Sequence, residues 1–226
     1  MAFLNKQKRP FTVVVEGNIG CGKTTFLNHC NKFNNVCVLA EPIEMWRNCN
    51  NHNLLGLLYQ DIKKWSFTFQ SYVQLTMLQQ HTKQTSCPIK LMERSIYSAR
   101  YCFVEKMKQD GLIPQASAAV IDKHFQWIRE NVDITVDLIV YLRTTPEVVY
   151  ERMLKRNRSE EKSVSLEYLQ ALHQIHEDWL YHKSLFDLPA NVLVLNANLD
   201  KSAICEEYLK VEGHILNKSV LINASV

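Results

Sequence analysis

The segment that most restricts the fold is EGNIGCGKTT, residues 16–25, which holds three of the six glycines in the chain. It begins at the last residue of FTVVVE (11–16), a β-branched apolar run typical of a buried strand, and it enters a helical pattern at 24–32. A G-x-x-x-x-G-K-T pattern between a strand and a helix is a P-loop, in which backbone N–H groups and the helix dipole bind phosphate. Lys23 then reaches the outer phosphates and the Thr24 hydroxyl binds Mg²⁺. We therefore predict a nucleotide phosphate site at Gly17, Asn18, Gly20, Cys21, Gly22, Lys23, Thr24 and Thr25.

The rest of the chain alternates apolar strands with helices. Further strands are predicted at 36–42, 89–93, 136–142 and 192–195, and further helices at 54–61, 65–83, 96–110, 116–130, 146–156, 165–184 and 200–216. Near-continuous apolar strands that alternate with helices favour a parallel sheet covered on both faces. We therefore predict an α/β P-loop kinase fold with a five-stranded parallel sheet. A length of 226 residues favours one domain, 1–226, with flexible ends at 1–10 and about 217–226.

Composition excludes several classes of protein. The net charge of +3 is too small for a strongly basic nucleic-acid-binding face. There is no secretory h-region, and no apolar run reaches the length of a membrane span. The seven cysteines are spread singly, without the C-x-x-C spacing of zinc or redox sites, and are interpreted as reduced thiols. We expect a cytoplasmic protein without nucleic-acid or membrane partners, with a mitochondrial or nuclear location as the alternative.

Carboxylates at two predicted strand ends indicate the reaction. A P-loop alone leaves ATPases, GTPases and kinases open, but NKFN (31–34) lacks the aspartate of the guanine-reading N-K-x-D motif. Glu41 follows VCVLA and Glu93 ends IKLME, so both should face the P-loop across one crevice. Phosphoryl transfer to a hydroxyl needs a base at the acceptor and a metal at the phosphates, and these glutamates, with Arg94 beside them, could supply both. A strand-end carboxylate such as Glu93 also occurs in P-loop motors.

The acceptor is predicted from the same glutamates. A base at Glu41 favours a neutral hydroxyl, as in a nucleoside or a sugar, over the charged acceptor of a nucleoside monophosphate kinase. A P-loop protein that switches a partner is the alternative from another class. Such a protein would have no use for a small-molecule pocket.

Two further patterns fit an acceptor pocket and a lid. Gln70, Val73 and Met77 share one helical face with Phe69 adjacent, and although such a face is usually core, the Gln70 amide suits the edge of a base. Trp46, Tyr59 and Phe103 offer flat surfaces for stacking. The run RMLKRNRSEEK (152–162) could be a solvated helix end or a mobile lid whose arginines bind the transferring phosphate. These arginines are Arg152, Arg156 and Arg158.

Taken together, GNIGCGKTT, EPIEMWRN, FQSYVQLTML, MERSIYSARYCFVE, DLIVYLRTTPE, RNRSEE and IHEDWL make residues 10–200 resemble the deoxyribonucleoside kinases. The resemblance is greatest to the branch that holds the insect multisubstrate enzymes and the mitochondrial thymidine kinases. It implies an ATP-dependent, Mg²⁺-dependent kinase of the deoxynucleoside 5'-hydroxyl that acts in nucleotide salvage. It also implies a homodimer and feedback binding of a deoxynucleoside triphosphate.

The resemblance also assigns roles to residues. Glu41 is the expected base with Arg94 beside it, while Glu93 is expected near Mg²⁺ or as the base. Gln70 pairs with the nucleobase, and Tyr59 and Glu161 hold the 3'-hydroxyl. The expected ring-flanking and pocket residues are Trp46, Phe103, Phe69, Val73, Met77, Ala99 and Met107. Uncharged Met77 and Ala99 leave room for a thymine methyl group, which favours thymidine and deoxycytidine, with purines as further substrates. Cys21 departs from the Ser or Ala of many relatives, and we expect it to react with thiol reagents unless ATP is bound.

Overall fold

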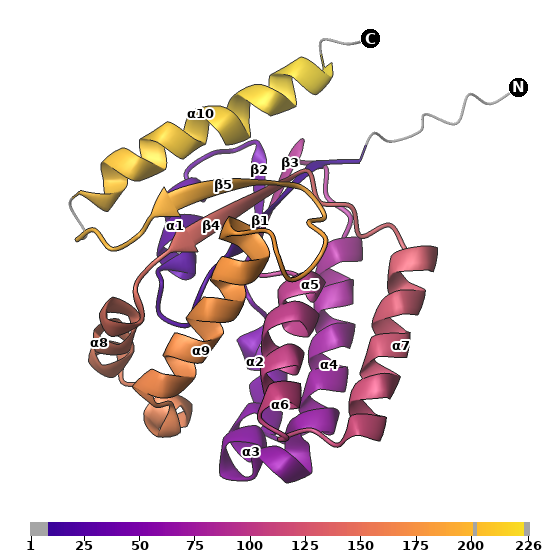
Figure 1. Ribbon diagram of the computed structural model, residues 1–226. Coiled ribbons are helices and arrows are strands. Elements are labelled where there is room, and N and C mark those ends of the chain that lie inside the picture. Colours follow the sequence, from indigo (N-terminus) through magenta and orange to yellow (C-terminus); the bar gives the residue numbers. More distant parts are fainter. Residues whose placement is uncertain (1–8, 201–202, 224–226) are drawn as a thin grey trace, which may run out of the picture.

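The computed structural model describes residues 9–200 and 203–223, which fold around one five-stranded sheet (Figure 1). All strand pairs are parallel, and the strand order is β2-β3-β1-β4-β5. The strands are β1 (Phe11–Glu16), β2 (Val36–Leu39), β3 (Ile89–Glu93), β4 (Leu138–Arg143) and β5 (Asn191–Asn196). The predicted α/β fold with a five-stranded parallel sheet is confirmed.

Helices cover both faces of the sheet (Figure 1). They are α1 (Lys23–Cys30), α2 (Ile43–Arg47), α3 (Leu54–Gln60), α4 (Ile62–Thr82), α5 (Ile96–Ser98), α6 (Glu105–Gln109), α7 (Gln115–Asn131), α8 (Pro146–Arg156), α9 (Leu166–His176) and α10 (Ile204–Asn223). The π-helical stretch η1 (Ala99–Val104) lies between α5 and α6, a second one, η3 (Glu177–Tyr181), continues α9 to its end, and η2 (Ser159–Ser163) is a 3₁₀ turn.

The alternation of side chains along each strand builds two cores. Val13 and Val15 of β1 pack with α1, α8 and α10 on one face of the sheet. Val14 points the other way, into the core formed with α2 to α7 and η3. Helix α9 lies at the boundary, because Leu169 joins the first core and Leu172 the second.

Several element bounds differ from prediction for local reasons. The second strand ends at Leu39 rather than at residue 42, because the chain turns into α2, whose N-cap is Pro42. The pattern missed α2 because five residues are too few to show helical periodicity. Helix α10 is helical to Asn223, beyond the predicted end at 216. Of the predicted flexible ends, 1–10 and about 217–226, residues 1–8 and 224–226 lie outside the described residues, whereas 217–223 belong to α10.

The strand order places a crevice beside the P-loop. The chain starts at the centre of the sheet, fills one side with β2 and β3, and then crosses to β4 and β5. Strand β1 therefore lies at the switch point, where ligands bind open α/β sheets beyond the carboxyl ends of the strands. The loop after β1 has the position that a nucleotide site requires.

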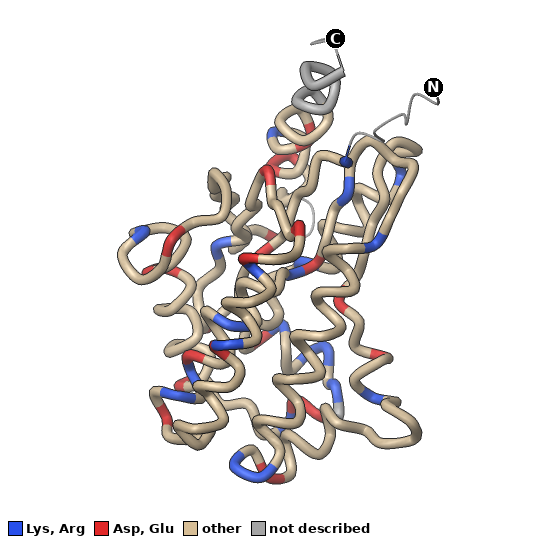
Figure 2. The backbone as a smooth tube through the Cα atoms, turned by 90° about the vertical axis from the view of Figure 1, so that its right-hand side faces the viewer, with Lys and Arg blue, Asp and Glu red and all other residues tan. Residues whose placement is uncertain are grey.

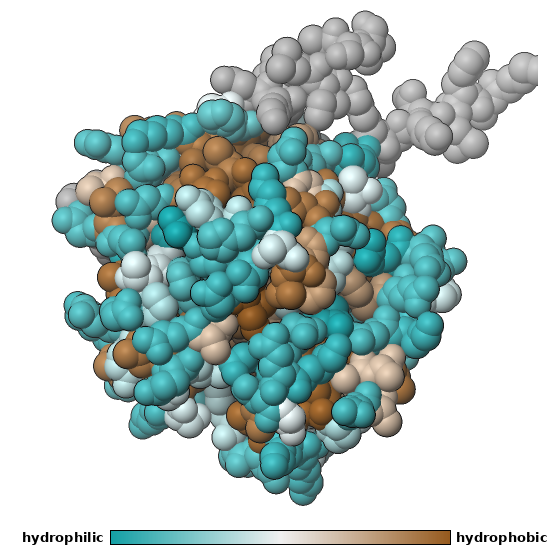
Figure 3. Space-filling view, viewed as in Figure 1, coloured by the Kyte–Doolittle hydropathy of each residue, from teal (hydrophilic) through white to brown (hydrophobic). Residues whose placement is uncertain are grey.

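The surface of the described residues is mixed in character. Basic and acidic residues are interspersed along the chain (Figure 2). One face is largely hydrophilic, with hydrophobic side chains gathered over β5 next to α10 (Figure 3), where Val194 is exposed. None of the helices in the described ranges is long and apolar enough to cross a bilayer.

Candidate active site

The loop between β1 and α1 has the backbone geometry that its glycines predict. Gly17 has φ +141°, and a Cβ there would lie 2.8 Å from the Leu142 carbonyl oxygen. Gly20 has φ +80°, and a Cβ there would lie 2.9 Å from the Val149 carbonyl oxygen. Both positions combine positive φ with close approach of another backbone, so glycine is required at both. The loop is thus held tightly against β4 and α8 at the start of α1.

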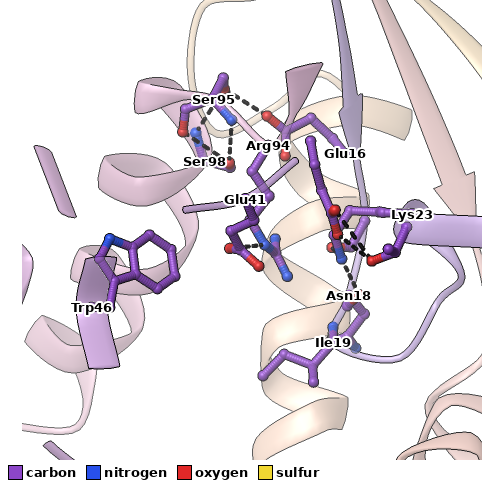
Figure 4. Close-up of polar contacts among 12 residues, drawn as sticks. Glu16, Asn18, Ile19, Lys23, Glu41, Trp46, Arg94, Ser95 and Ser98 are labelled. Carbon is purple, nitrogen blue, oxygen red and sulfur yellow. Dashed lines mark hydrogen bonds and ion pairs between the residues drawn. The ribbon is translucent and has the colours of Figure 1, made fainter. Parts of the chain in front are cut away.

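Side chains within the loop hold it in shape. Asn18 Nδ2 donates to the Leu169 carbonyl oxygen of α9 (2.8 Å), and its Oδ1 accepts from the Ile19 backbone N–H (2.8 Å). Lys23 is folded back, and its Nζ donates to the carbonyl oxygens of Gly17 (3.2 Å) and Asn18 (2.8 Å) (Figure 4). The ammonium group is therefore buried against the loop from which it would reach a phosphate.

The two glutamates predicted to face the P-loop do so. The Thr24 hydroxyl donates to both carboxylate oxygens of Glu93, at 3.0 and 3.2 Å. Glu41 forms an ion pair with Arg94, whose Nε lies 3.0 Å from Oε1 (Figure 4). Burial raises the pKa of Glu41, an effect that Arg94 and Lys23 oppose and Glu93 reinforces. The site thus places one carboxylate by the Thr24 hydroxyl and a second one beside a fixed cation.

Arg94 is held in an unusual backbone conformation. Its φ of +62° is left-handed, which costs energy for a non-glycine residue, and its N–H donates to the Val15 carbonyl oxygen (2.9 Å). Its guanidinium group also lies over the Phe103 ring, 4.6 Å from the ring centre. Contacts on both sides therefore fix the direction in which this cation points.

A third strand-end glutamate, Glu16, supports this turn and was not predicted. It is fully buried, and its Oε1 accepts from the Ser95 hydroxyl at 2.6 Å (Figure 4), while its Oε2 has no hydrogen-bond partner among the described residues. Desolvation raises the pKa of Glu16 to about 7, against the opposing effects of Arg94, Ser95, Ser98 and Lys23. The argument that selected Glu41 and Glu93 applies equally to Glu16 at the end of β1.

A cavity of about 220 Å³ extends from the P-loop between α3, α4 and α6. Trp46 is fixed in its wall, because its Nε1 donates to Thr76 Oγ1 (2.9 Å) and its ring meets Phe69 edge-on. Gln70 Nε2 donates to the Met107 sulfur (3.7 Å), whereas no donor among the described residues reaches Gln70 Oε1. A buried acceptor without a donor is costly, and a ligand N–H would satisfy it.

The lid segment, residues 157–165, closes one side of this cavity. Glu161 accepts from Arg156 Nη2 at 2.6 and 2.7 Å and from Arg158 Nη1 at 3.4 Å. The buried phenol of Tyr59 also faces the cavity, and burial raises its pKa. The lid segment and the last residue of α8 therefore present the Glu161 carboxylate and the guanidinium groups of Arg156 and Arg158 to one space.

Most of the predicted site residues line this cavity. They are Gly20, Lys23, Thr24, Glu41, Trp46, Tyr59, Phe69, Gln70, Val73, Met77, Glu93, Arg94, Ala99, Phe103, Met107, Arg156, Arg158 and Glu161. Others belong to the loop or the start of α1 without lining the cavity, namely Gly17, Asn18, Cys21, Gly22 and Thr25. Their placement agrees with a loop whose backbone N–H groups, rather than its side chains, would bind phosphate.

Arg152 and Cys21 are placed differently from expectation. Arg152 lies outside the cavity, where its guanidinium group donates to the carbonyl oxygens of Ala197 and Leu199 at 2.8 Å. Cys21 has a free thiol but is only 1% exposed, so a reagent cannot reach it in this conformation. Cys205 is the exposed thiol of the described residues.

Sequence reasoning missed several cavity residues. They are Ile19, Ile43, Arg47, Leu55, Leu58, Ile62, Ser95, Lys106, Asp110, Leu112, Glu160, Ser163, Val164, Ser165 and Tyr168. Helical periodicity could have found Lys106 and Asp110, which share a helical face with Phe103. Tyr168 comes from α9, and nothing in its neighbourhood in the sequence indicates that it lines the cavity.

Comparison with known proteins shows the family to which the chain belongs. A family model described as deoxynucleoside kinase matches residues 13–219. The chain is 46% identical over 211 residues to mitochondrial thymidine kinase 2 of Homo sapiens, covering 93% of this chain and 80% of that protein. It is 34% identical to deoxycytidine kinase 2 of Gallus gallus, covering 90% and 89%, and 31% identical to deoxycytidine kinase of Homo sapiens, covering 84% of each. The chain therefore belongs to the deoxynucleoside kinase family, whose members phosphorylate deoxynucleosides.

Proposed function

We propose that the chain transfers the γ-phosphoryl group of ATP to the 5'-hydroxyl of a deoxynucleoside, with Glu41 as the base. The observation that carries this proposal is the Glu41–Arg94 pair in the cavity wall. Burial strengthens Glu41 as a proton acceptor by raising its pKa, while the fixed cation Arg94 favours its ionised form. Glu93 is the alternative base, because it lies in the same crevice.

Thr24 and Glu93 fit the expected Mg²⁺ ion. A hydroxyl and a carboxylate at hydrogen-bond distance are oxygen ligands of the kind that Mg²⁺ accepts, and it commonly takes only one or two protein carboxylates together with phosphates and water. When bound, the ion would neutralise charge on the phosphates. The chain's own part is to hold these two oxygens beside the P-loop.

We propose thymidine and deoxycytidine as the preferred acceptors. Gln70 offers its free Oε1 to a base N–H, and Trp46 and Phe103 provide ring surfaces in the same cavity. Met77 and Ala99 are buried and uncharged, which leaves the cavity wall near Gln70 apolar. The names of the relatives, thymidine kinase and deoxycytidine kinase, agree with this choice.

One assay tests the acceptor. Purified protein is mixed with labelled ATP and Mg²⁺ and given thymidine, thymidine monophosphate or no acceptor. Label in thymidine monophosphate is the expected result. Label only in the diphosphate would indicate a nucleoside monophosphate kinase, and label only in free phosphate would indicate an ATPase or a switch protein; either result would reject the proposal.

The base is tested by Glu41→Gln, which keeps the size of the side chain but cannot accept the proton. Turnover should fall by ~10²-fold or more, because loss of a general base has effects of this order. Thymidine binding, measured by calorimetry, should change little. Glu93→Gln is the matched variant, and unchanged turnover in Glu41→Gln with loss in Glu93→Gln would move the base to Glu93.

Further proposals concern regulation, assembly and location. A deoxynucleoside triphosphate should inhibit competitively with both substrates, because the P-loop and the acceptor cavity are continuous. Residues 1–226 should form a single kinase domain, in keeping with the family match over 13–219. We propose a homodimer in the cytoplasm. Mitochondria are the alternative location, since two relatives are named as mitochondrial, and fractionation of cells that express the full chain distinguishes the two.

A further inference from the structure

A bidentate ion pair connects two walls of the active site. Arg47 at the end of α2 donates from Nε to Glu160 Oε1 (2.7 Å) and from Nη2 to Glu160 Oε2 (3.2 Å), although 113 residues separate them. Both residues line the cavity. The side chain of Glu160 is 11% exposed and that of Arg47 30%. A bidentate pair that is this well shielded restricts geometry far more than an exposed pair does.

Arg47 and Glu160 each lie next to residues that are proposed to bind the substrates. Trp46 precedes Arg47, and Glu41 lies just before α2, so this wall carries proposed acceptor-binding and catalytic groups. On the other wall Glu160 precedes Glu161, which holds Arg156 and Arg158. The position of η2 relative to α2 therefore decides where the Glu161 carboxylate lies.

We propose that Arg47 and Glu160 are positioning residues that hold the lid segment across the crevice, so that Glu161 meets the sugar of the acceptor. This inference rests on the proposed role of Glu161 in binding the acceptor. Among the described residues, no hydrogen bond or ion pair joins Arg47 or Glu160 to the base at Glu41 or to the phosphate loop. Loss of the pair should therefore weaken acceptor binding more than it slows the transfer step, because Glu161 still holds the lid arginines Arg156 and Arg158.

The kinetic test compares Arg47→Met and Glu160→Gln with the unaltered chain. In each variant KM for thymidine should rise ~10-fold while kcat stays within about threefold, the pattern of lost uniform binding. Arg47→Lys keeps the positive charge but cannot form the bidentate contact, so its KM for thymidine should lie between those of Arg47→Met and the unaltered chain. The control is Glu44→Gln, because Arg47 Nη1 also donates to Glu44 (2.8 Å), whose side chain is 84% exposed. This control should match the unaltered chain.

A charge reversal provides the specific test of pairing. Arg47→Glu with Glu160→Arg is made together with Glu44→Gln, so that the reversed side chain at position 47 does not face a second carboxylate. The reversed pair should recover most of the KM that either reversal alone loses. Losses that simply add, or a fall in kcat with KM unchanged, would overturn the proposal.

Hydrogen exchange in the protein without substrates separates this inference from the proposed function. Amides of residues 157–165 should exchange faster in Arg47→Met and Glu160→Gln than in Glu44→Gln, and the reversed pair should restore protection. Equal exchange in all variants overturns the positioning role. Failure of the unaltered chain to phosphorylate thymidine would instead reject the proposed function and leave the exchange result to be judged by itself.

Discussion

Glu16 is the buried group whose protonation is most open to measurement. Its pKa of about 7 is raised mainly by desolvation, so the folded state holds a proton that the unfolded chain releases above its ordinary pKa of 4.5. Folded molecules thus bind more protons than unfolded ones between these values, and stability attributable to Glu16 is lost as pH rises from 4.5 to 7. Above pH 7 the loss is complete.

We expect Glu16→Gln to abolish this loss. Between pH 4.5 and 7 the free energy of unfolding of the unaltered chain should fall by about 3 kcal/mol relative to that of the variant. Urea unfolding at several pH values measures it. The buried His81 and His176, whose pKa values burial lowers to about 3, affect both proteins alike. Parallel pH profiles would show that Glu16 has an ordinary pKa in the folded state.

Cysteine labelling gives a second expectation for single residues. Because Cys21 is buried and Cys205 is exposed, Cys205 should be modified first by a thiol reagent, with Cys21 much slower. Mass spectrometry of digested protein after timed labelling distinguishes them. Rapid labelling of Cys21 that ATP suppresses would show that the loop opens in solution, as the sequence-based expectation requires.

Among the elements, the short helix α5 depends on a capping box that also reaches the active site. Ser95 Oγ accepts from the Ser98 N–H (3.2 Å) and donates to Glu16, and the Ser95 N–H donates to the Ser98 hydroxyl oxygen (3.2 Å). Ser95→Ala should lower the free energy of unfolding by about 2 to 4 kcal/mol, because it removes a cap and leaves a buried carboxyl without its donor. Denaturant unfolding measures this change.

The control for this prediction is Ser165→Ala. Ser165 caps α9 by accepting from the Tyr168 N–H (3.2 Å), with no buried carboxyl behind it. Its loss should cost only about 1 kcal/mol. Equal costs at the two caps would contradict the role given to the Glu16 contact.

The sequence predicts elements well where local signals are strong. The bounds of β3 and α8 agree with prediction at both ends. Pro88 precedes the apolar run of the strand, and Pro146 begins the helix. The strand-end rule also brings Glu41 and Glu93 to one crevice. Pairs such as Arg47 with Glu160, or Asn18 with the Leu169 carbonyl, are not predictable in this way, because residues 113 or 151 positions apart meet only through tertiary packing.

For the whole molecule, the proposed homodimer has a candidate face on α4 and α7, which pack side by side (Figure 1). Val120 and Trp127 are one heptad apart on α7 and are exposed, as is Leu75 of α4. Large exposed apolar side chains that share a helix face are typical of interfaces. Val120→Glu with Trp127→Glu should therefore convert the dimer to a monomer in sedimentation experiments. The exposed Leu154→Glu on α8 is the control, and an unchanged dimer in the first variant would place the interface elsewhere.

The contacts of Glu161 have a consequence for how the two substrates affect each other. The carboxylate proposed to meet the acceptor sugar is held by Arg156 and Arg158, the side chains proposed to meet the donor phosphates. Binding of either substrate therefore changes the ion pairs between Glu161 and the two arginines, on which binding of the other substrate depends. Such shared partners make the two binding free energies interdependent, and the interdependence is reciprocal by thermodynamic linkage. ATP and thymidine should thus change each other's dissociation constants by the same factor.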